Sequence, residues 1–136
     1  MWYNIGEVNS MDWLHRERMI LGDEAVEKLK GASVLVFGVG GVGGYVVEAL
    51  TRAGVGRLSL VDNDRISETN LNRQIIATRE TIGKSKVEVM SERIKSINPE
   101  CGTTLFETFA TAENTGEIIE KAAPDFIVDA IDTVTT

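Results

Sequence analysis

Short apolar stretches alternate with amphipathic stretches along most of this chain. Four stretches rich in apolar or β-branched residues have the length of buried strands. These predicted strands are Ser33–Phe37, Leu58–Val61, Thr103–Glu107 and Phe126–Ile131. Elsewhere, apolar residues recur at spacings of three and four, which is the period of an amphipathic helix. The predicted helices are Tyr45–Arg52, Lys84–Ile97, Asn114–Ala122 and two shorter helices within Asp12–Lys30 that meet near Gly22.

The alternation of strands and helices indicates the fold class. Three successive strand–helix–strand units favour an α/β fold with a parallel sheet that carries helices on both faces. In a Rossmann-like fold of this kind the expected strand order is 3-2-1-4. We divide the chain into an N-terminal helical segment, residues 1–30, and a Rossmann-like domain, residues 31–136.

Composition narrows the possible functions. The 136 residues carry a formal charge of −7, which argues against a free-standing nucleic-acid binder because such a protein needs a basic face. No stretch approaches the roughly 18 apolar residues of a membrane helix, so we expect no membrane partner. A single cysteine, Cys101, excludes an internal disulfide framework and favours a reducing, cytoplasmic location.

A glycine-rich motif lies between the first predicted strand and the helix that follows it. Residues 38–43 (GVGGVG) have the GxGxxG spacing. Gly38 permits a tight turn, Gly40 lets the backbone approach a phosphate, and Gly43 allows the helix to pack closely on the strand. The helix N-terminus adds free N–H groups for an anion. The motif therefore predicts nucleotide binding, and the alternative is a purely structural glycine turn.

Asp62 ends the second predicted strand, 19 residues after Gly43. An acid at this point commonly accepts hydrogen bonds from ribose hydroxyls. The alternative is that Asp62 only caps the turn that it forms with Asn63 and Asp64.

A basic segment follows this turn. From Arg65 to Lys95, seven basic residues stand against four acidic ones, in a chain that is acidic overall. We expect this segment at the mouth of the nucleotide cleft. A triphosphate needs cationic partners, whereas a dinucleotide needs little more than the glycine loop. The alternative is a solvated helix face, which covers Arg79, Arg93 and Lys95.

In combination, these motifs resemble the ubiquitin-activating-enzyme-like superfamily, also called the ThiF/MoeB/HesA family. The resemblance extends from about Arg16 to Thr136. It rests on the glycine motif, Asp62, Asn70-Leu71-Asn72-Arg73-Gln74, Lys86 and Asp129-Ala130-Ile131-Asp132. Within the family, the chain is most similar to the tRNA threonylcarbamoyladenosine dehydratases. That likeness rests on residues 70–75, 83–90, 97–100 and 128–133.

The resemblance implies an enzyme that uses ATP and Mg²⁺ to adenylate a substrate carboxylate. It implies that Asp62 holds the ribose and that the loop of Gly38, Gly40, Gly41 and Gly43 contacts the nucleotide. It implies phosphate contacts for Asn70 and Arg73, a secondary nucleotide role for Gln74, and contact of Lys86 with the leaving phosphates. Asp132 is the implied magnesium ligand, with Asp129 as the other candidate.

The family also implies a homodimer in which an N-terminal arginine of one subunit enters the active site of the other. Arg16 and Arg18 are the candidates, and we prefer Arg16. The alternative is that both arginines are simply solvated. Cys101 precedes the third predicted strand, away from the carboxyl ends of the strands, and we expect no catalytic role for it.

In the dehydratase branch, the carboxylate belongs to the threonylcarbamoyl group of a modified tRNA adenosine, and its activation leads to cyclisation and dehydration. One alternative is adenylation of the C-terminal glycine of a ubiquitin-like sulfur-carrier protein, with a sulfur donor as a further partner. Another, from a different class, is a plain NAD-binding domain. Chains of the family normally continue further, so we expect an adenylation domain truncated after its fourth strand. We then expect tRNA to bind mainly through the missing half, and activity of the fragment alone is doubtful.

Overall fold

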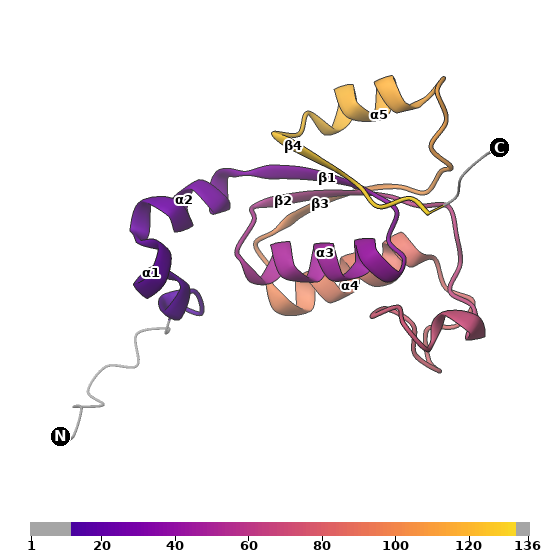
Figure 1. Cartoon of the computed structure of the whole chain (residues 1–136), viewed down its shortest axis with the longest axis horizontal. Helices are drawn as coiled ribbons and strands as arrows, with labels where there is room; N and C mark the ends of the chain where they lie inside the picture. The colour runs from indigo at the N-terminus through magenta and orange to yellow at the C-terminus, as the bar shows by residue number, and fades with distance from the viewer. Residues whose placement is uncertain (1–11, 133–136) are drawn as a thin grey trace.

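A computed structural model describes residues 12–132, and Figure 1 shows one sheet with helices against both of its faces. Its four strands are β1 (Ser33–Phe37), β2 (Arg57–Val61), β3 (Gly102–Phe106) and β4 (Phe126–Asp129). All neighbouring strands are parallel, and the order β3-β2-β1-β4 confirms the order expected from the sequence. The ends of the proposed division, residues 1–11 and 133–136, lie outside the described residues, and the boundary at residue 30 stays a prediction.

Five α-helices and one short 3₁₀ turn connect and cover the described strands. They are α1 (His15–Leu21), α2 (Asp23–Gly31), α3 (Gly41–Arg52), η1 (Glu68–Asn70), α4 (Lys86–Ile97) and α5 (Thr115–Ala122). Helices α3 and α4 lie on one face of the sheet, and α5 covers the other (Figure 1). Among residues 12–132, no helix is long and apolar enough to cross a membrane.

Several element boundaries differ from the sequence prediction by one or two residues, and the start of α3 differs by four. Helix α3 begins at Gly41 rather than at Tyr45, because the backbone of Gly40 already accepts the first helical hydrogen bond, from Gly44. Strand β4 ends at Asp129 rather than at Ile131. Its neighbour β1 ends at Phe37, whose carbonyl oxygen accepts a hydrogen bond from the N–H of Ala130 at 2.8 Å, and Gly38 then turns away with a left-handed φ of +86°.

The core is divided by the central strand β1, whose five residues are all buried. Val34 and Val36 pack with residues of α3 and α4, in a cluster that includes Val47, Met90 and Ile94. Leu35 and Phe37 pack on the opposite face, in a cluster that includes Val61, Ile118 and Ala122. Burial on both faces explains why the sequence of β1 is continuously apolar rather than alternating.

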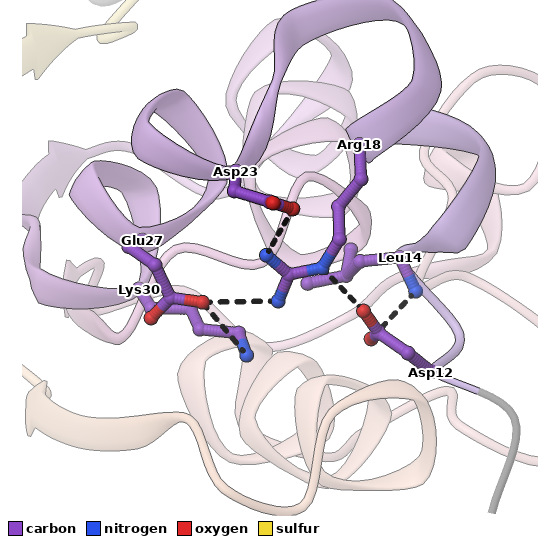
Figure 2. Close-up of polar contacts among 6 residues, drawn as sticks. All are labelled: Asp12, Leu14, Arg18, Asp23, Glu27 and Lys30. Carbon is purple, nitrogen blue, oxygen red and sulfur yellow. Dashed lines mark hydrogen bonds and ion pairs between the residues drawn. The ribbon is translucent and has the colours of Figure 1, made fainter.

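The N-terminal helices α1 and α2 meet at Gly22, as the sequence predicts, and Gly22 has a φ of +84°. Figure 2 shows that Arg18 joins the two sides of this bend. Its guanidinium pairs with Asp12, with Asp23 at 3.4 Å and with Glu27 at 3.0 Å. Hydrogen bonding to Arg18 lowers the pKa of Asp12 and of Glu27. Arg18 is therefore engaged within its own chain.

Helices α3 and α4 are tied together by Glu48, whose side chain is only 11% exposed. Arg93 of α4 donates to its two carboxylate oxygens at 2.6 and 2.9 Å, and Arg52 of α3 donates at 2.9 Å. The hydrogen bonds from Arg93 are the main reason that the pKa of Glu48 is lowered, against the opposing effect of its burial. This ion pair fixes the helix after the glycine motif relative to the helix that begins at Lys86.

We expect Glu48→Gln to lower the free energy of unfolding by about 1–3 kcal/mol at pH 7, measured by urea denaturation. Because the pKa of Glu48 is lower in the folded protein than in the unfolded chain, its contribution is present above the unfolded value. As the pH falls, the contribution begins to be lost near 4.5, the pKa of a glutamate in the unfolded chain. It is gone once the pH has fallen below the lowered pKa of Glu48 in the folded protein. The matched control is Glu117→Gln, which removes the exposed pair of Glu117 with Lys121 and should cause little change. An equal loss for Glu48→Gln at pH 7 and pH 3 would contradict this assignment.

Candidate nucleotide-binding site

A cavity of about 490 Å³ opens at the carboxyl ends of the strands. It brings together most of the site residues inferred from the sequence. Those that line it are Gly38, Gly40, Gly41, Asp62, Asn70, Arg73, Gln74, Lys86 and Asp132. Gly43 and Arg16 do not line it. The carboxyl end of a parallel sheet is the usual location of ligands in α/β folds.

The four glycines of the motif divide into two pairs. A Cβ on Gly43 would fall 1.7 Å from the carbonyl oxygen of Gly38, and a Cβ on Gly38 would fall 2.8 Å from that of Ala130. These two glycines therefore serve backbone packing. A Cβ on Gly40 or Gly41 would meet nothing closer than 3.5 Å, so these two face the open cavity and leave the backbone accessible to a ligand.

Asp62 connects the end of β2 to the glycine motif. One carboxylate oxygen accepts a hydrogen bond from the N–H of Val39 at 2.9 Å, and the other accepts one from the N–H of Asp64 at 2.8 Å. Asp62 thus caps its turn, as the alternative interpretation held, and also lines the cavity. Contact with a ribose stays a prediction.

The segment that contains Arg73 and Gln74 lies directly over the glycine motif. The Arg73 side chain is the nearest group to a Cβ built on Gly41, and the Gln74 carboxamide is the nearest to one built on Gly40. Arg73 also donates to the carbonyl oxygen of Thr69 at 3.0 Å. Gln74 is buried, and its Oε1 has no hydrogen-bond partner among the described residues. Two polar side chains are therefore held at the motif by packing.

Asn70 has a structural role in addition to the one expected. Its Oδ1 accepts a hydrogen bond from the N–H of Ser67 at 2.9 Å and closes the capping box of η1. The side-chain oxygen is therefore used within the protein, and the amide NH₂ is the group that remains for a ligand in the cavity.

The basic segment reaches the cavity with only two of its seven cations, Arg73 and Lys86. Arg79 pairs with Glu68 at 2.6 Å and Arg93 pairs with Glu48, both outside the cavity. The segment therefore reaches the cavity only in part, and Arg79 and Arg93, which the alternative interpretation set apart, lie outside it. Helix α4 begins at Lys86 and runs away from the cavity with a rise of about 1.5 Å per residue, which carries its later basic residues out of reach.

Lys86 is the more deeply buried of the two cavity cations. Its side chain is only 7% exposed, and its Nζ lies 3.5 Å from Asp64 Oδ2. The side chain of Ser85, the N-cap residue of α4, accepts no capping hydrogen bond.

The two candidate magnesium ligands are separated by the structure. Asp132 lines the cavity, whereas Asp129 is the last residue of β4, does not line it, and accepts a hydrogen bond from the N–H of Ile131 at 3.2 Å. No group of three or more histidine, cysteine, aspartate or glutamate residues within 12–132 is arranged to hold a metal ion. A cation here would need ligands from a bound phosphate as well.

Arg16 is exposed on α1, which lies at the opposite end of the sheet from the cavity (Figure 1). Cys101 is buried immediately before β3, and burial raises the pKa of its thiol. A buried thiol with a raised pKa is a poor nucleophile, in agreement with the expected absence of a catalytic role.

Among the lining residues that the sequence analysis did not assign to the site, Thr108, Phe109 and Ala110 form one continuous segment. They follow β3, so their position was available in principle, because the carboxyl ends of parallel strands share one edge of a sheet. Phe109 is 48% exposed and gives the cavity an apolar wall.

The strand order, the glycine motif and the position of the cavity define a Rossmann-like domain with a candidate nucleotide site at the carboxyl ends of its strands. The ThiF family model matches residues 14–136, and the chain belongs to the ThiF family.

Curated relatives of this chain carry more than one activity. The tRNA threonylcarbamoyladenosine dehydratase of Haemophilus influenzae is 48% identical over 113 residues, which cover 83% of this chain and 43% of that protein. The sulfur carrier protein adenylyltransferase of Thermus thermophilus is 38% identical over 128 residues, which cover 93% of this chain and 46% of that protein. The chain spans less than half the length of each of these two relatives.

A solved structure also resembles this chain. Escherichia coli tRNA N6-threonylcarbamoyladenosine dehydratase in complex with ATP superposes with a TM-score of 0.85 at 40% identity. The match covers 94% of this chain and 54% of that one.

Because the glycines have two roles, substitution by alanine should affect stability differently at Gly43 and at Gly41. Gly43→Ala should destabilise the fold by about 3 kcal/mol or more, because its new methyl group meets backbone that cannot rotate away. Gly41→Ala is the matched control, since its methyl group would lie 3.7 Å from the Arg73 side chain and alanine favours the helix. Urea unfolding of both variants measures the difference. Equal stability of the two would refute the packing role of Gly43.

Proposed function

We propose that this chain is the nucleotide-binding part of an ATP-dependent tRNA threonylcarbamoyladenosine dehydratase. The observation that carries the proposal is the convergence of Arg73, Lys86 and the open glycines Gly40 and Gly41 on one cavity. The dehydratases of Haemophilus influenzae and Bacillus subtilis, at 48% and 44% identity, support this branch of the family.

The proposed reaction begins with adenylation of the threonylcarbamoyl carboxylate. A carboxylate oxygen forms a bond to the α-phosphorus of ATP, and the bond from that phosphorus to the bridging oxygen of the β-phosphate breaks. Pyrophosphate leaves with the electron pair. A nitrogen of the same substrate then displaces AMP from the acyl carbon and closes a ring, so that water is lost overall. Such chemistry depends mainly on positioning and on stabilisation of the developing charge.

Each cavity residue has a proposed part in this step. The backbone at Gly40 and Gly41 accommodates the nucleotide, and Asp62 accepts hydrogen bonds from the ribose. Asn70 and Arg73 bind phosphate oxygens, with Gln74 as a secondary contact. Lys86 stabilises the negative charge on the departing pyrophosphate.

Magnesium fits the cavity as a partner of bound ATP. Mg²⁺ is usually held by one or two carboxylates together with substrate phosphates rather than by a cage of protein ligands. Asp132 lines the cavity and offers such a carboxylate, and no cage exists among residues 12–132. When bound, Mg²⁺ would neutralise part of the phosphate charge.

We further propose a homodimer in which Arg16 acts in the cavity of the partner subunit. Arg18 is bound to three carboxylates of its own chain, whereas Arg16 is exposed and lies at the far end of the sheet from its own cavity. The reaction belongs in the cytoplasm, with tRNA bound mainly by parts of the protein beyond this chain.

A second candidate function is adenylation of a ubiquitin-like sulfur-carrier protein, with a sulfur donor downstream. The Thermus thermophilus adenylyltransferase favours this candidate, because its 38% identity extends over 93% of this chain. The NAD-binding alternative is less well supported, since the cavity provides two cations that a dinucleotide does not require.

ATP–pyrophosphate exchange on the full-length protein tests the proposed function. We expect exchange that depends on Mg²⁺ and on tRNA carrying threonylcarbamoyladenosine, and unmodified tRNA is the control. Exchange stimulated by a carrier protein instead would establish the second candidate. Tighter binding of NAD than of Mg-ATP, without exchange, would refute adenylation altogether.

Substitutions of the two cavity cations test the residue roles. We expect Arg73→Ala and Lys86→Ala each to weaken ATP use by about 10- to 100-fold in kcat/KM, because a charged hydrogen bond contributes about 1.5–3 kcal/mol. Arg79→Ala is the matched control: it removes an arginine of the same segment that pairs with Glu68 outside the cavity. Wild-type rates in the first two variants would show that the phosphates bind elsewhere.

A further inference from the structure

Lys86 has a resident partner in the cavity, the carboxylate of Asp64. The ammonium group belongs to a side chain that is only 7% exposed, and its Nζ lies 3.5 Å from Asp64 Oδ2. Within residues 12–132, no other carboxylate lies within 4 Å of this ammonium. Asp64 also lines the cavity, and its own side chain is 64% exposed.

The backbone of Asp64 places the two side chains together. The N–H of Lys86 donates to the carbonyl oxygen of Asp64 at 3.1 Å. The N–H of Asp64 donates to Asp62 Oδ1 at 2.8 Å, and Asp62 Oδ2 accepts a hydrogen bond from the N–H of Val39. One turn after β2 therefore joins the glycine motif to the first residue of α4, and Asp64 stands at the centre of that connection.

The pairing with Asp64 gives the buried ammonium of Lys86 a counter-charge. A buried ammonium without a counter-charge is costly, because it has lost its hydration and gained no partner. Asp64 supplies that counter-charge before any ligand binds. A triphosphate offers the same ammonium several charged oxygens, so the carboxylate and the phosphates compete for one cation.

We propose that Asp64 is the resident counter-ion of Lys86, which holds the ammonium in the empty cavity and yields it to the terminal phosphates of a bound nucleoside triphosphate. Asp64 is then a positioning residue and not a ligand of the nucleotide. The identity of the ligand rests on the proposed function, whereas the pairing of Asp64 with Lys86 is a contact within the chain.

The net charge of the cavity predicts whether Asp64 strengthens or weakens the binding of ATP. Its lining includes the carboxylates of Asp62, Asp64 and Asp132 against the cations Arg73 and Lys86. An excess of negative charge opposes a polyanion, so neutralising Asp64 should strengthen the binding of ATP. If Asp64 only shaped the turn, its substitution would have the opposite effect, because a distorted turn would weaken the binding of every nucleotide.

A double-mutant cycle tests the pairing in the empty protein. Thermal unfolding is measured for Asp64→Asn, Lys86→Met and the double variant of the full chain. In the wild-type background, we expect Asp64→Asn to lower Tm by about 2–4 °C. In the Lys86→Met background, we expect the same substitution to lower Tm by less than about 1 °C. Glu68→Gln is the control, because its pair with Arg79 lies outside the cavity, and its effect should be equal in both backgrounds. Additive effects of the two cavity substitutions would overturn the pairing.

Calorimetric binding of Mg-ATP and of AMP tests the displacement. We expect Asp64→Asn to bind Mg-ATP about threefold more tightly than the wild type, since exposure of Asp64 limits its electrostatic effect. AMP, which lacks the terminal phosphates, should bind with unchanged affinity, and Asp64→Glu should behave as the wild type. Unchanged or weaker Mg-ATP binding in Asp64→Asn would overturn the displacement. A wild type that binds neither nucleotide would refute the proposed function, and the cycle would still decide the pairing.

Discussion

The close approach of helix α3 to strand β1 determines the geometry of this site. Gly43 lies so near the carbonyl oxygen of Gly38 that no side chain could stand between them, and Gly38 is similarly close to Ala130. Both contacts involve backbone, which has no rotamer by which to escape. The turn between β1 and α3 is therefore held against the residue that follows β4. Gly40 and Gly41 are left facing the cavity at the N-terminus of α3, where backbone N–H groups favour an anion.

The position of Lys86 depends on ties at both ends of the helix that carries it. At its far end, Arg93 binds Glu48 of α3, and at its near end Asp64 binds the backbone of Lys86. Lysine is a long and flexible side chain that loses entropy when it is ordered. A fixed helix start and a resident counter-ion place part of that cost in the folding of the protein rather than in the binding of a ligand. Preorganised charge of this kind is what a reaction with developing negative charge requires.

Much of the fold could be predicted because burial leaves a strong signal in sequence. The continuous apolar run of β1 identifies a strand buried on both faces, and the three- and four-residue spacing of Val87, Met90 and Ile94 identifies α4. The start of α3 could not be predicted, since glycine has a low helix propensity and the packing of Gly43 against Gly38 is tertiary information. The end of β4 depends on where its neighbour β1 ends, which is tertiary information.

The candidate site shows the same division between local and tertiary information. The glycine motif and the segment of Arg73 could be recognised, because their chemistry requires particular residue types at particular spacings. The role of Phe109 could not, since its position after β3 was available in principle but an apolar residue there has no chemical signature. The partner of Lys86 also could not, because Asp64 comes near it only when the bridge between Arg65 and Ser85 brings the two segments together.

The distribution of charge connects the cavity to the substrate proposed for it. Three carboxylates and two cations line a site that would hold a triphosphate, so the cavity by itself does not neutralise its ligand. The proposed triphosphate would then need a divalent cation, and the carboxylate of Asp132 in the lining is compatible with one. The same reasoning applies at larger scale. A chain of net charge −7 repels the phosphate backbone of a tRNA. The proposed tRNA substrate would then need a basic surface other than the one that these acidic residues provide.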